Sequence, residues 1–301
     1  MPEADQWPIS DTWHYHDLLD GLDEYVNAVD RLYGKAESLD DFCRKVQLIN
    51  YDSYRAMFES WNSRLWGDAS GVLLWMSHPA WPSVEWQTYS WDYETFGSYF
   101  GSRKACEPVH VQMNLDDHDV VVLNTTTSPL DDMKVTLTCY DLAGKKISAT
   151  IVKDIDVPAN SRKDLFKAEL EGINGNFIVR LVLSDRKGKV VTVNDYMMRG
   201  EGTEDFKALN SVGKAQIKAR KVSSQDGVLR YEITNTTGNI AFNLKFNLCD
   251  EKTGEIILPA FFSDGYFHLL PGEKRTLEVH SPSTGAIMVE GYNVDNTTLK
   301  L

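Results

Sequence analysis

The sequence predicts a mixed α and β chain, in which the tail of an α/β barrel or layered α/β fold precedes two β-sandwiches. Two observations lead to this prediction. Apolar residues repeat at helical spacing through the first hundred residues, and from Val109 onward they alternate with period two between turn signals. All eight tryptophans lie between Trp7 and Trp91, so the composition changes where the periodicity changes. We therefore expect a domain boundary near Pro108.

Three segments of the first third have the apolar spacing of helices. Residues 22–33 place apolar side chains at i, i+3, i+4 and i+7, and a glycine follows them. A longer pattern covers residues 39–66 and begins behind a Ser-x-x-Asp capping box at Ser38. A short helix is expected around residues 98–106.

Residues 71–76 read differently from these helices. They form a continuous apolar run, Gly-Val-Leu-Leu-Trp-Met, bounded by glycine and by Pro79. Such a run predicts a strand buried on both faces, as in a parallel sheet, and a Trp- and Pro-rich loop follows at 77–94. One strand cannot form a parallel sheet, so we expect this region to be part of a larger domain.

The remaining residues read as two sandwiches of about 100 residues each. Short strands alternate with turn signals, and the segment 199–203 is the expected hinge between the two units. In each unit a strand runs into Asn-Thr-Thr, at 124–126 and at 235–237, which indicates an internal repeat. The predicted domains are 1–108, 109–200 and 201–301.

The charge balance restricts the class of partner. The chain has 31 Lys+Arg against 44 Asp+Glu, a net charge of −13, and residues 1–108 carry 8 basic against 18 acidic side chains. This argues against nucleic acid or an anionic membrane as a partner, since both would be repelled. The longest apolar run is far below the roughly 20 residues of a membrane span. An acidic, Trp-rich segment suits an uncharged or cationic carbohydrate, because aromatic faces stack on sugar C–H groups and carboxylates accept from hydroxyl or ammonium groups.

Several segments together resemble a known enzyme family. They are RAMFESWN at 55–62, LW at 65–66, GVLLWMSHPAWPS at 71–83, QTY at 87–89 and KACEP at 104–108. They resemble the last barrel strand and final helix of family 2 glycoside hydrolases, in the exo-β-D-glucosaminidase and β-mannosidase branch. WHYH at 13–16 resembles the segment after the nucleophile strand of that branch. The resemblance is specific over about 7–108 and looser over 109–301.

The resemblance implies a fold and an activity. The fold is the C-terminal remnant of a (β/α)8 TIM barrel over 1–108, followed by two immunoglobulin-like β-sandwich domains over 109–200 and 201–301. The activity is retaining, exo-acting hydrolysis of terminal β-linked amino sugars such as chitosan oligosaccharides, without a cofactor. The implied partners are that carbohydrate, or a mannoside, and the missing N-terminal part of the same enzyme. Export of the parent protein, to an extracytoplasmic location, is implied by the family alone.

The resemblance also places the catalytic residues outside this chain. Retaining enzymes of this kind use two carboxylates about 5–5.5 Å apart. In the family pattern both carboxylates sit on barrel strands before the one at 71–76, so we expect no catalytic residue in this chain and no activity from the chain alone.

Four residues are predicted to contact substrate: Trp75, His78, Trp81 and Trp86. Trp75 would stack beneath a sugar from the last strand, and the others lie in the loop where barrel active sites are built. The alternatives are core packing for Trp75, a turn-shaping role for His78, and wedging against a neighbouring domain for the loop tryptophans.

Two other clusters have plainer explanations. Glu85, Asp92 and Glu94 suggest a solvated acidic loop more than a shifted catalytic pair, although such a carboxylate can also pair with the ammonium group of a glucosamine. His14 and His16 have metal-binding spacing without a nearby third ligand, so no metal is expected.

Alternative functions remain open. The parent enzyme can be a β-mannosidase or β-galactosidase of the same family. The chain can also be a non-catalytic carbohydrate-binding or accessory β-sandwich protein, or a structural, adhesive one. The Trp-rich strand and loop favour the hydrolase, because a pure sandwich protein does not need them.

Overall fold

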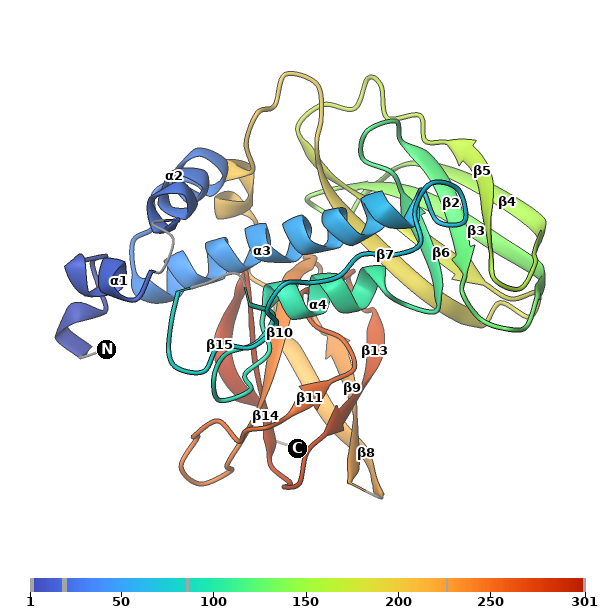
Figure 1. Ribbon diagram of the computed structural model, residues 1–301. Coiled ribbons are helices and arrows are strands. Elements are labelled where there is room, and N and C mark those ends of the chain that lie inside the picture. The colour runs from blue at the N-terminus through green and yellow to red at the C-terminus, as the bar shows by residue number, and fades with distance from the viewer. Residues whose placement is uncertain (1–2, 18–20, 85–86, 226, 300–301) are drawn as a thin grey trace. The chain divides into compact units, whose positions relative to one another are not determined.

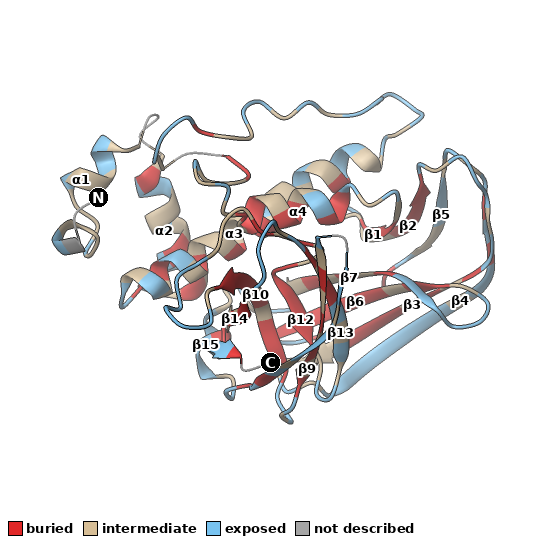
Figure 2. Cartoon of the chain, turned by 90° about the horizontal axis from the view of Figure 1, so that it is seen from below, coloured by how far each residue is buried: buried red, intermediate tan, exposed pale blue. Residues whose placement is uncertain are grey.

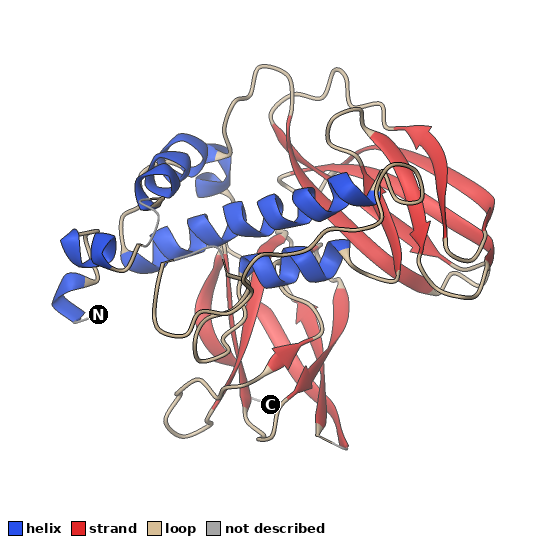
Figure 3. Cartoon of the chain, viewed as in Figure 1, coloured by secondary structure: helices blue, strands red, loops and turns tan. Residues whose placement is uncertain are grey.

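The computed structural model describes residues 3–17, 21–84, 87–225 and 227–299. The chain divides into two compact units. Unit 1 comprises Met1–Asp52, Trp75–Phe100 and Asp205–Leu301, and unit 2 comprises Ser53–Leu74 and Gly101–Glu204. The α-helices of the described residues all precede the first strand, as the predicted change of period requires (Figures 1 and 3).

The helices follow the predicted segments closely. They are α1 (Asp11–Tyr15), α2 (Leu22–Tyr33), α3 (Leu39–Asn62) and α4 (Gly97–Ala105), with the 3-10 turns η1 (Glu3–Asp5) and η2 (Lys207–Ser211). The helix predicted over 22–33 is confirmed with the same bounds. It buries Leu22, Val29 and Tyr33 along one stripe, and Gly34 ends it with a positive φ of 83°.

The two ends of α3 have different explanations. One half of the predicted capping box forms, since the Asp41 N–H donates to Ser38 Oγ at 3.2 Å, while the Asp41 carboxylate accepts from the Glu37 N–H at 3.1 Å. At the other end the helix stops at Asn62, four residues before the predicted Trp66. Trp66 has a positive φ of 63°, which an α-helix cannot contain, and Asn62 Nδ2 instead donates to the Ala105 carbonyl at 2.7 Å.

The strand predicted over 71–76 does not form. All six residues lie in the described part of the chain, and none of them belongs to a strand. Leu73 is 97% exposed and Trp75 is 78% exposed. The physical reason is that a strand needs a neighbour to satisfy its backbone hydrogen bonds, and no described strand pairs with this run.

Unit 2 contains the first sandwich, built from antiparallel strands only. Its three-stranded sheet has the order β1-β2-β5, and its four-stranded sheet the order β4-β3-β6-β7. The bounds are β1 (Val109–Met113), β2 (Asp119–Asn124), β3 (Leu130–Asp141), β4 (Lys146–Val157), β5 (Ser161–Lys167), β6 (Asn176–Ser184) and β7 (Val190–Arg199). One core cluster takes residues from both sheets, including Val111, Leu137 and Leu181, and β6 is buried along most of its length (Figure 2).

Unit 1 contains the second sandwich, with two four-stranded antiparallel sheets. Their orders are β12-β10-β14-β15 and β11-β13-β9-β8. The bounds are β8 (Ile217–Gln225), β9 (Val228–Asn235), β10 (Ala241–Cys249), β11 (Phe261–Phe262), β12 (Phe267–Leu269), β13 (Lys274–His280), β14 (Ala286–Gly291) and β15 (Val294–Leu299). Tyr231, Phe242 and Phe262 are fully buried aromatic anchors of this core. The described chain is therefore mostly β-sandwich with few helices, consistent with immunoglobulin-like domains.

The Asn-Thr-Thr repeat has the same structural role in both sandwiches. Asn124 and Asn235 are each 0% exposed at the end of a strand. The Oδ1 of Asn124 accepts from the Thr126 N–H and hydroxyl, and its Nδ2 donates to the carbonyls of Ser128 and Pro158. Asn235 repeats this pattern on its own turn. Each asparagine thus satisfies backbone groups that have no place in the strand ladders.

Replacing this buried amide should destabilise one sandwich. Asn124→Ala removes the buried amide that donates to the Ser128 and Pro158 carbonyls and accepts from Thr126. At about 1 kcal/mol for each of these hydrogen bonds, we expect a loss of about 3 kcal/mol in the free energy of unfolding. Urea unfolding followed by circular dichroism measures it. Thr150→Ala, at an exposed position of β4, is the control and should change little. Equal effects of the two variants would contradict this role.

A buried polar cluster joins α3 to the first sandwich within unit 2. Glu59 is 3% exposed, and its Oε1 lies 3.0 Å from Nε2 of the fully buried His110 on β1. Its Oε2 accepts from the Tyr196 hydroxyl at 2.9 Å, and Asn194 Nδ2 donates to Oε1 at 2.7 Å. Arg55 lies over the Tyr196 ring at 4.3 Å. A buried carboxylate is tolerated here because each oxygen has partners.

A second carboxylate completes the surroundings of His110. Glu107 Oε2 lies 3.4 Å from His110 Nδ1, and Glu107 Oε1 accepts from Lys104 at 2.7 Å. Burial opposes the charge of His110, but the hydrogen bonds to Glu107 and Glu59 outweigh burial and raise its pKa above the ordinary value. Burial also opposes the charge of Glu107 and so raises its pKa. The hydrogen bonds and positive charges of His110 and Lys104 outweigh burial and lower that pKa to about 2.

These shifts predict how stability depends on pH. Because the pKa of His110 is raised by folding, its contribution is complete below the unfolded value of about 6.5 and is lost as pH rises through the folded pKa. Glu107 acts in the opposite sense, and its contribution is lost as pH falls from about 4.5 toward its folded pKa. Urea unfolding between pH 4 and 9 should show a decline on the alkaline side that His110→Gln removes. Parallel profiles for the two proteins would rule out this assignment.

Candidate functional site

The residues predicted to contact sugar lie on or beside one loop of unit 1. We call residues 77–84 and 87–94 the aromatic loop. It contains His78 and Trp81, and Trp75 lies two residues before it. Trp75 and Trp81 are 78% and 53% exposed, so both rings are largely accessible. Trp86, the fourth predicted contact, lies outside the described residues. Sugar contact by these four residues stays a prediction.

His78 is held inside a stack of aromatic rings. Its ring lies 4.9 Å from that of Tyr93, nearly parallel at 12°, and 5.1 Å from that of Tyr89. Its Nε2 lies 3.3 Å from the Trp91 carbonyl oxygen. These contacts fix the imidazole against the loop's own backbone, which accords with a loop-shaping role for His78.

The segment before α2 lies beside the aromatic loop. The Val84 N–H donates to the His16 carbonyl at 2.9 Å, and Asp17 and Val84 form a parallel bridge. His16 Nδ1 lies 3.1 Å from the Pro82 carbonyl, and its ring is 6.3 Å from that of Trp81. These contacts bring together the segment that resembles the one after the nucleophile strand of the enzyme family and the segment that resembles its last barrel strand.

A tight turn closes the C-terminal end of the loop. The Ser90 N–H donates to the Glu94 carbonyl at 2.9 Å, and the Glu94 N–H donates to Ser90 Oγ at 3.1 Å. Ser90 Oγ donates to the Asp92 carboxylate, and the Tyr93 N–H donates to the Ser90 carbonyl. Tyr93 has a positive φ of 70°. The turn therefore depends on side-chain hydrogen bonds from Ser90 and Asp92.

The carboxylates of this loop are used in structure. Asp92 bonds within the turn, as described above. Glu94 accepts from Lys245 Nζ at 2.6 Å, so Glu94 is neither a solvated loop charge nor an unpaired acid. Glu85, the third member of the predicted cluster, lies outside the described residues. The described part of this cluster therefore does not resemble a catalytic carboxylate pair.

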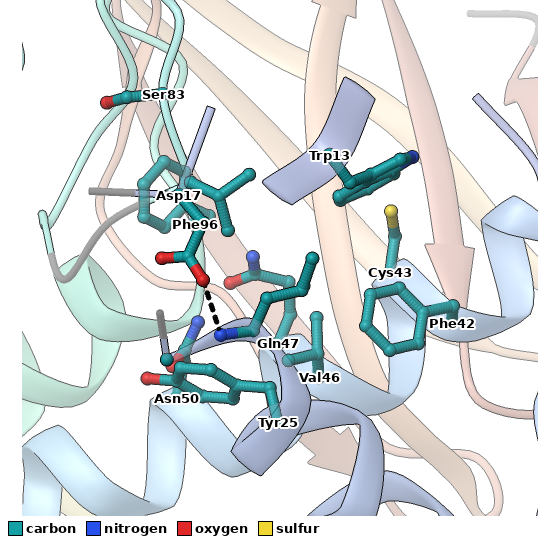
Figure 4. A pocket seen from close by; sticks show the side chains of 13 residues that line it. Trp13, Asp17, Tyr25, Phe42, Cys43, Val46, Gln47, Asn50, Ser83 and Phe96 are labelled. Carbon is teal, nitrogen blue, oxygen red and sulfur yellow. Dashed lines mark hydrogen bonds between the residues drawn. The ribbon is translucent and has the colours of Figure 1, made fainter. Parts of the chain in front are cut away.

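A pocket of about 280 Å³ lies between the loop and helices α2 and α3 (Figure 4). Its apolar lining includes Trp13, Tyr25 and Phe42. Asp17 also lines it and accepts from the Leu22 N–H at 2.7 Å. The remaining lining residues are Gly21, Cys43, Val46, Gln47, Asn50, Ser83, Val84 and Phe96. The Cys43 thiol is exposed to the pocket, and desolvation there raises its pKa to about 11, which is opposite to the shift that activates a cysteine.

Sequence reasoning missed the contact that places α4. The side chain of Gln47 on α3 accepts from the Gly97 N–H at 2.9 Å. A Cβ on Gly97 would lie 2.1 Å from the Gln47 carbonyl oxygen, so only glycine allows this approach. The available signal was the glycine immediately before a short helical pattern, but its partner is 50 residues away.

No group of three or more His, Cys, Asp or Glu side chains among the described residues is arranged to hold a metal ion. No helix within the described ranges is long and apolar enough to cross a membrane.

Two family models match the sandwich region. Residues 116–199 match the Mannosidase Ig/CBM-like domain, and residues 195–294 match the exo-beta-D-glucosaminidase Ig-fold domain.

The chain is also similar to curated enzymes and to a solved structure. It is 28% identical to an exo-beta-D-glucosaminidase of Amycolatopsis orientalis, over 97% of this chain and 32% of the relative. It is 28% identical to a mannosylglycoprotein endo-beta-mannosidase of Lilium longiflorum, over 93% of this chain and 37% of that relative. The crystal structure of the Amycolatopsis orientalis exo-chitosanase CsxA superimposes with a TM-score of 0.86 at 25% identity, over 99% of this chain and 39% of that one.

The chain matches the C-terminal part of family 2 glycoside hydrolases of the exo-β-D-glucosaminidase and β-mannosidase branch. The resemblance found in the sequence is thereby confirmed. The chain spans about a third of the length of the curated relatives it matches.

The close approach at Gly97 yields a stability prediction for this chain. Gly97→Ala places a methyl group against the rigid backbone of α3, and we expect a loss of about 3 kcal/mol in the free energy of unfolding. Gly21→Ala is the matched control, because a Cβ there meets nothing within 4 Å. Thermal and urea unfolding measure both variants. A Gly97→Ala protein as stable as Gly21→Ala would show that α4 is not fixed in this way.

Proposed function

We propose that this chain is the C-terminal part of a retaining, exo-acting glycoside hydrolase that cleaves terminal β-linked amino sugars such as those of chitosan oligosaccharides. The observation that supports this most is the likeness to exo-β-D-glucosaminidases along nearly the whole chain. The Amycolatopsis orientalis enzyme has been crystallised in complex with PNP-beta-D-glucosamine. The acidity of residues 1–108 is suited to a cationic sugar.

In this proposal residues 1–108 are the last part of a (β/α)8 barrel, and the domains 109–200 and 201–301 are accessory immunoglobulin-like sandwiches. The exposure of Leu73 and Trp75 supports the barrel assignment, because large apolar side chains at such exposure mark a surface that another part of a protein covers. In the proposal, the part that covers this surface corresponds to the portion of the relatives that this chain does not match.

The aromatic loop then forms one wall of the sugar-binding site. Trp75 and Trp81 offer exposed faces for stacking on a pyranose, and His78 orders the loop between them and the Ser90 turn. Trp86 is included because it lies in the Trp-rich segment that follows the expected last barrel strand. Both catalytic carboxylates belong to the part of the enzyme outside this chain, so the chain by itself should be inactive and should need no cofactor. We also infer an extracytoplasmic location for the parent protein, from the family.

A second candidate is β-mannosidase activity of the parent enzyme. The match of residues 116–199 to the Mannosidase Ig/CBM-like domain and the likeness to the Lilium longiflorum enzyme favour it. The two candidates differ in the sugar at the aromatic loop, a 2-amino sugar in one and a mannose in the other.

Binding by the purified chain tests the sugar wall. We expect chitobiose, the β-linked glucosamine dimer, to quench tryptophan fluorescence with millimolar affinity, and Trp81→Ala to weaken binding about fivefold, the equivalent of one ring stack of about 1 kcal/mol. Trp61→Ala, a half-exposed tryptophan of α3, should bind as the unaltered chain does. β-Linked mannobiose in place of chitobiose tests the second candidate. If Trp81→Ala binds chitobiose as tightly as the unaltered chain does, the proposed wall is contradicted.

A further inference from the structure

The aromatic loop ends in an ion pair with the second sandwich, inside unit 1. Lys245 on β10 lies with its Nζ 2.6 Å from Glu94 Oε1 and 3.5 Å from Glu290 Oε1. Glu290 is its cross-strand neighbour on β14. The Lys245 side chain is only 17% exposed, and the two carboxylates are 29% and 32% exposed. This is a partly buried cation between two acids, with one acid supplied by the loop.

Tyr266 lies near Lys245, and other aromatic rings pack against Tyr266. Tyr266 stacks on Tyr51 of α3 at 6.1 Å, and lies 5.8 Å from the ring of Phe100 on α4. Burial by itself would lower the pKa of Lys245, but Tyr266 and the carboxylates Glu94 and Glu290 outweigh it and raise that pKa well above its ordinary value. The lysine therefore stays charged, and its attraction for Glu94 acts at reduced dielectric.

A chain of contacts leads from this lysine to the predicted sugar contacts. Lys245 fixes the Glu94 side chain, and the Glu94 backbone exchanges hydrogen bonds with Ser90. The Ser90 turn holds Tyr93 at its positive φ.

The contacts continue from the turn to the imidazole. The Tyr93 ring and the Trp91 carbonyl together hold His78. Each step is a short, direct contact between groups with defined geometry.

We propose that Lys245 is a positioning residue, through which the second sandwich fixes the aromatic loop in its sugar-binding conformation. The proposal rests on the proposed function of that loop. It assigns a part in substrate binding to a domain that contributes no residue to the wall itself. A partly buried ion pair is a poor means of gaining stability, since desolvation offsets much of the attraction, whereas it defines one geometry for the loop.

The test combines loop dynamics with sugar affinity in the full 301-residue chain. The variants are Lys245→Met, which removes the charge, Lys245→Arg, which keeps it, and Glu290→Gln, which removes the carboxylate that does not belong to the loop. Hydrogen–deuterium exchange read by mass spectrometry follows residues 87–97, with β9 as the internal reference. Fluorescence titration with chitobiose follows binding.

We expect Lys245→Met to exchange about tenfold faster in the loop while β9 is unchanged, and to bind chitobiose about tenfold more weakly. Lys245→Arg should restore both properties, and Glu290→Gln should retain both. If the lysine were merely structural, Lys245→Met would also speed the exchange of β9, or Lys245→Arg would fail to restore the loop and the affinity. Either result overturns the proposal.

Two further outcomes separate this proposal from the proposed function. If the unaltered chain binds no chitobiose but its loop loosens in Lys245→Met, the sugar wall fails and the anchor of the loop stands on the exchange data. If Lys245→Met loosens the loop and binds chitobiose as tightly as the unaltered chain, the positioning role is overturned while the sugar wall stands.

Discussion

A charge removed from water must find a partner, and this constraint determines how the first third of the chain is held. Glu59 of α3 reaches His110 and Tyr196 of the first sandwich, within unit 2. Glu94 at the end of the aromatic loop reaches Lys245 of the second sandwich, within unit 1. In both places an acid from the helical region is paired with a base on a sandwich strand. Loss of His110 would remove one partner of the buried Glu59 carboxylate, whereas loss of Glu94 would leave Lys245 paired with Glu290 alone.

The same constraint explains why the aromatic loop has a defined shape despite its exposed rings. Its middle is fixed by the backbone contacts of Val84 with residues 16–17, and its C-terminal end by the ion pair of Glu94 with Lys245. Near its start, His78 is stacked against Tyr93. Exposed aromatic faces on a fixed frame are what a sugar-binding surface needs, because little ordering then remains to be done on binding. The second sandwich holds the loop through Lys245.

Local signals predicted much of this fold. The spacing of Leu22, Val29 and Tyr33 located α2, Ser38 located the start of α3, and the Asn-Thr-Thr repeat marked equivalent turns in two sandwiches. These features depend on neighbours in sequence or on one side-chain pattern repeated. The expected strand at 71–76 failed because strand formation depends on partners, which an apolar run cannot supply for itself.

The anchors of the site lay beyond sequence reasoning for a related reason. Glu94 and Lys245 are 151 residues apart, and nothing in the local pattern of either one names the other. Glu94 in particular looked like one acid among several in a solvated loop. The long-range pairing of charges emerges only when the sheet order places β10 beside β14 and the loop turn faces them.

Hydrolysis of an aryl β-D-glucosaminide by the purified 301-residue chain tests the central claim most directly. The account holds that this chain forms a wall of the active site while both catalytic carboxylates lie elsewhere in the enzyme. The expected result is that the chain releases the aryl group no faster than buffer does. The same protein sample must be shown to have folded sandwiches. Turnover by the chain alone that persists through repeated purification would contradict the account.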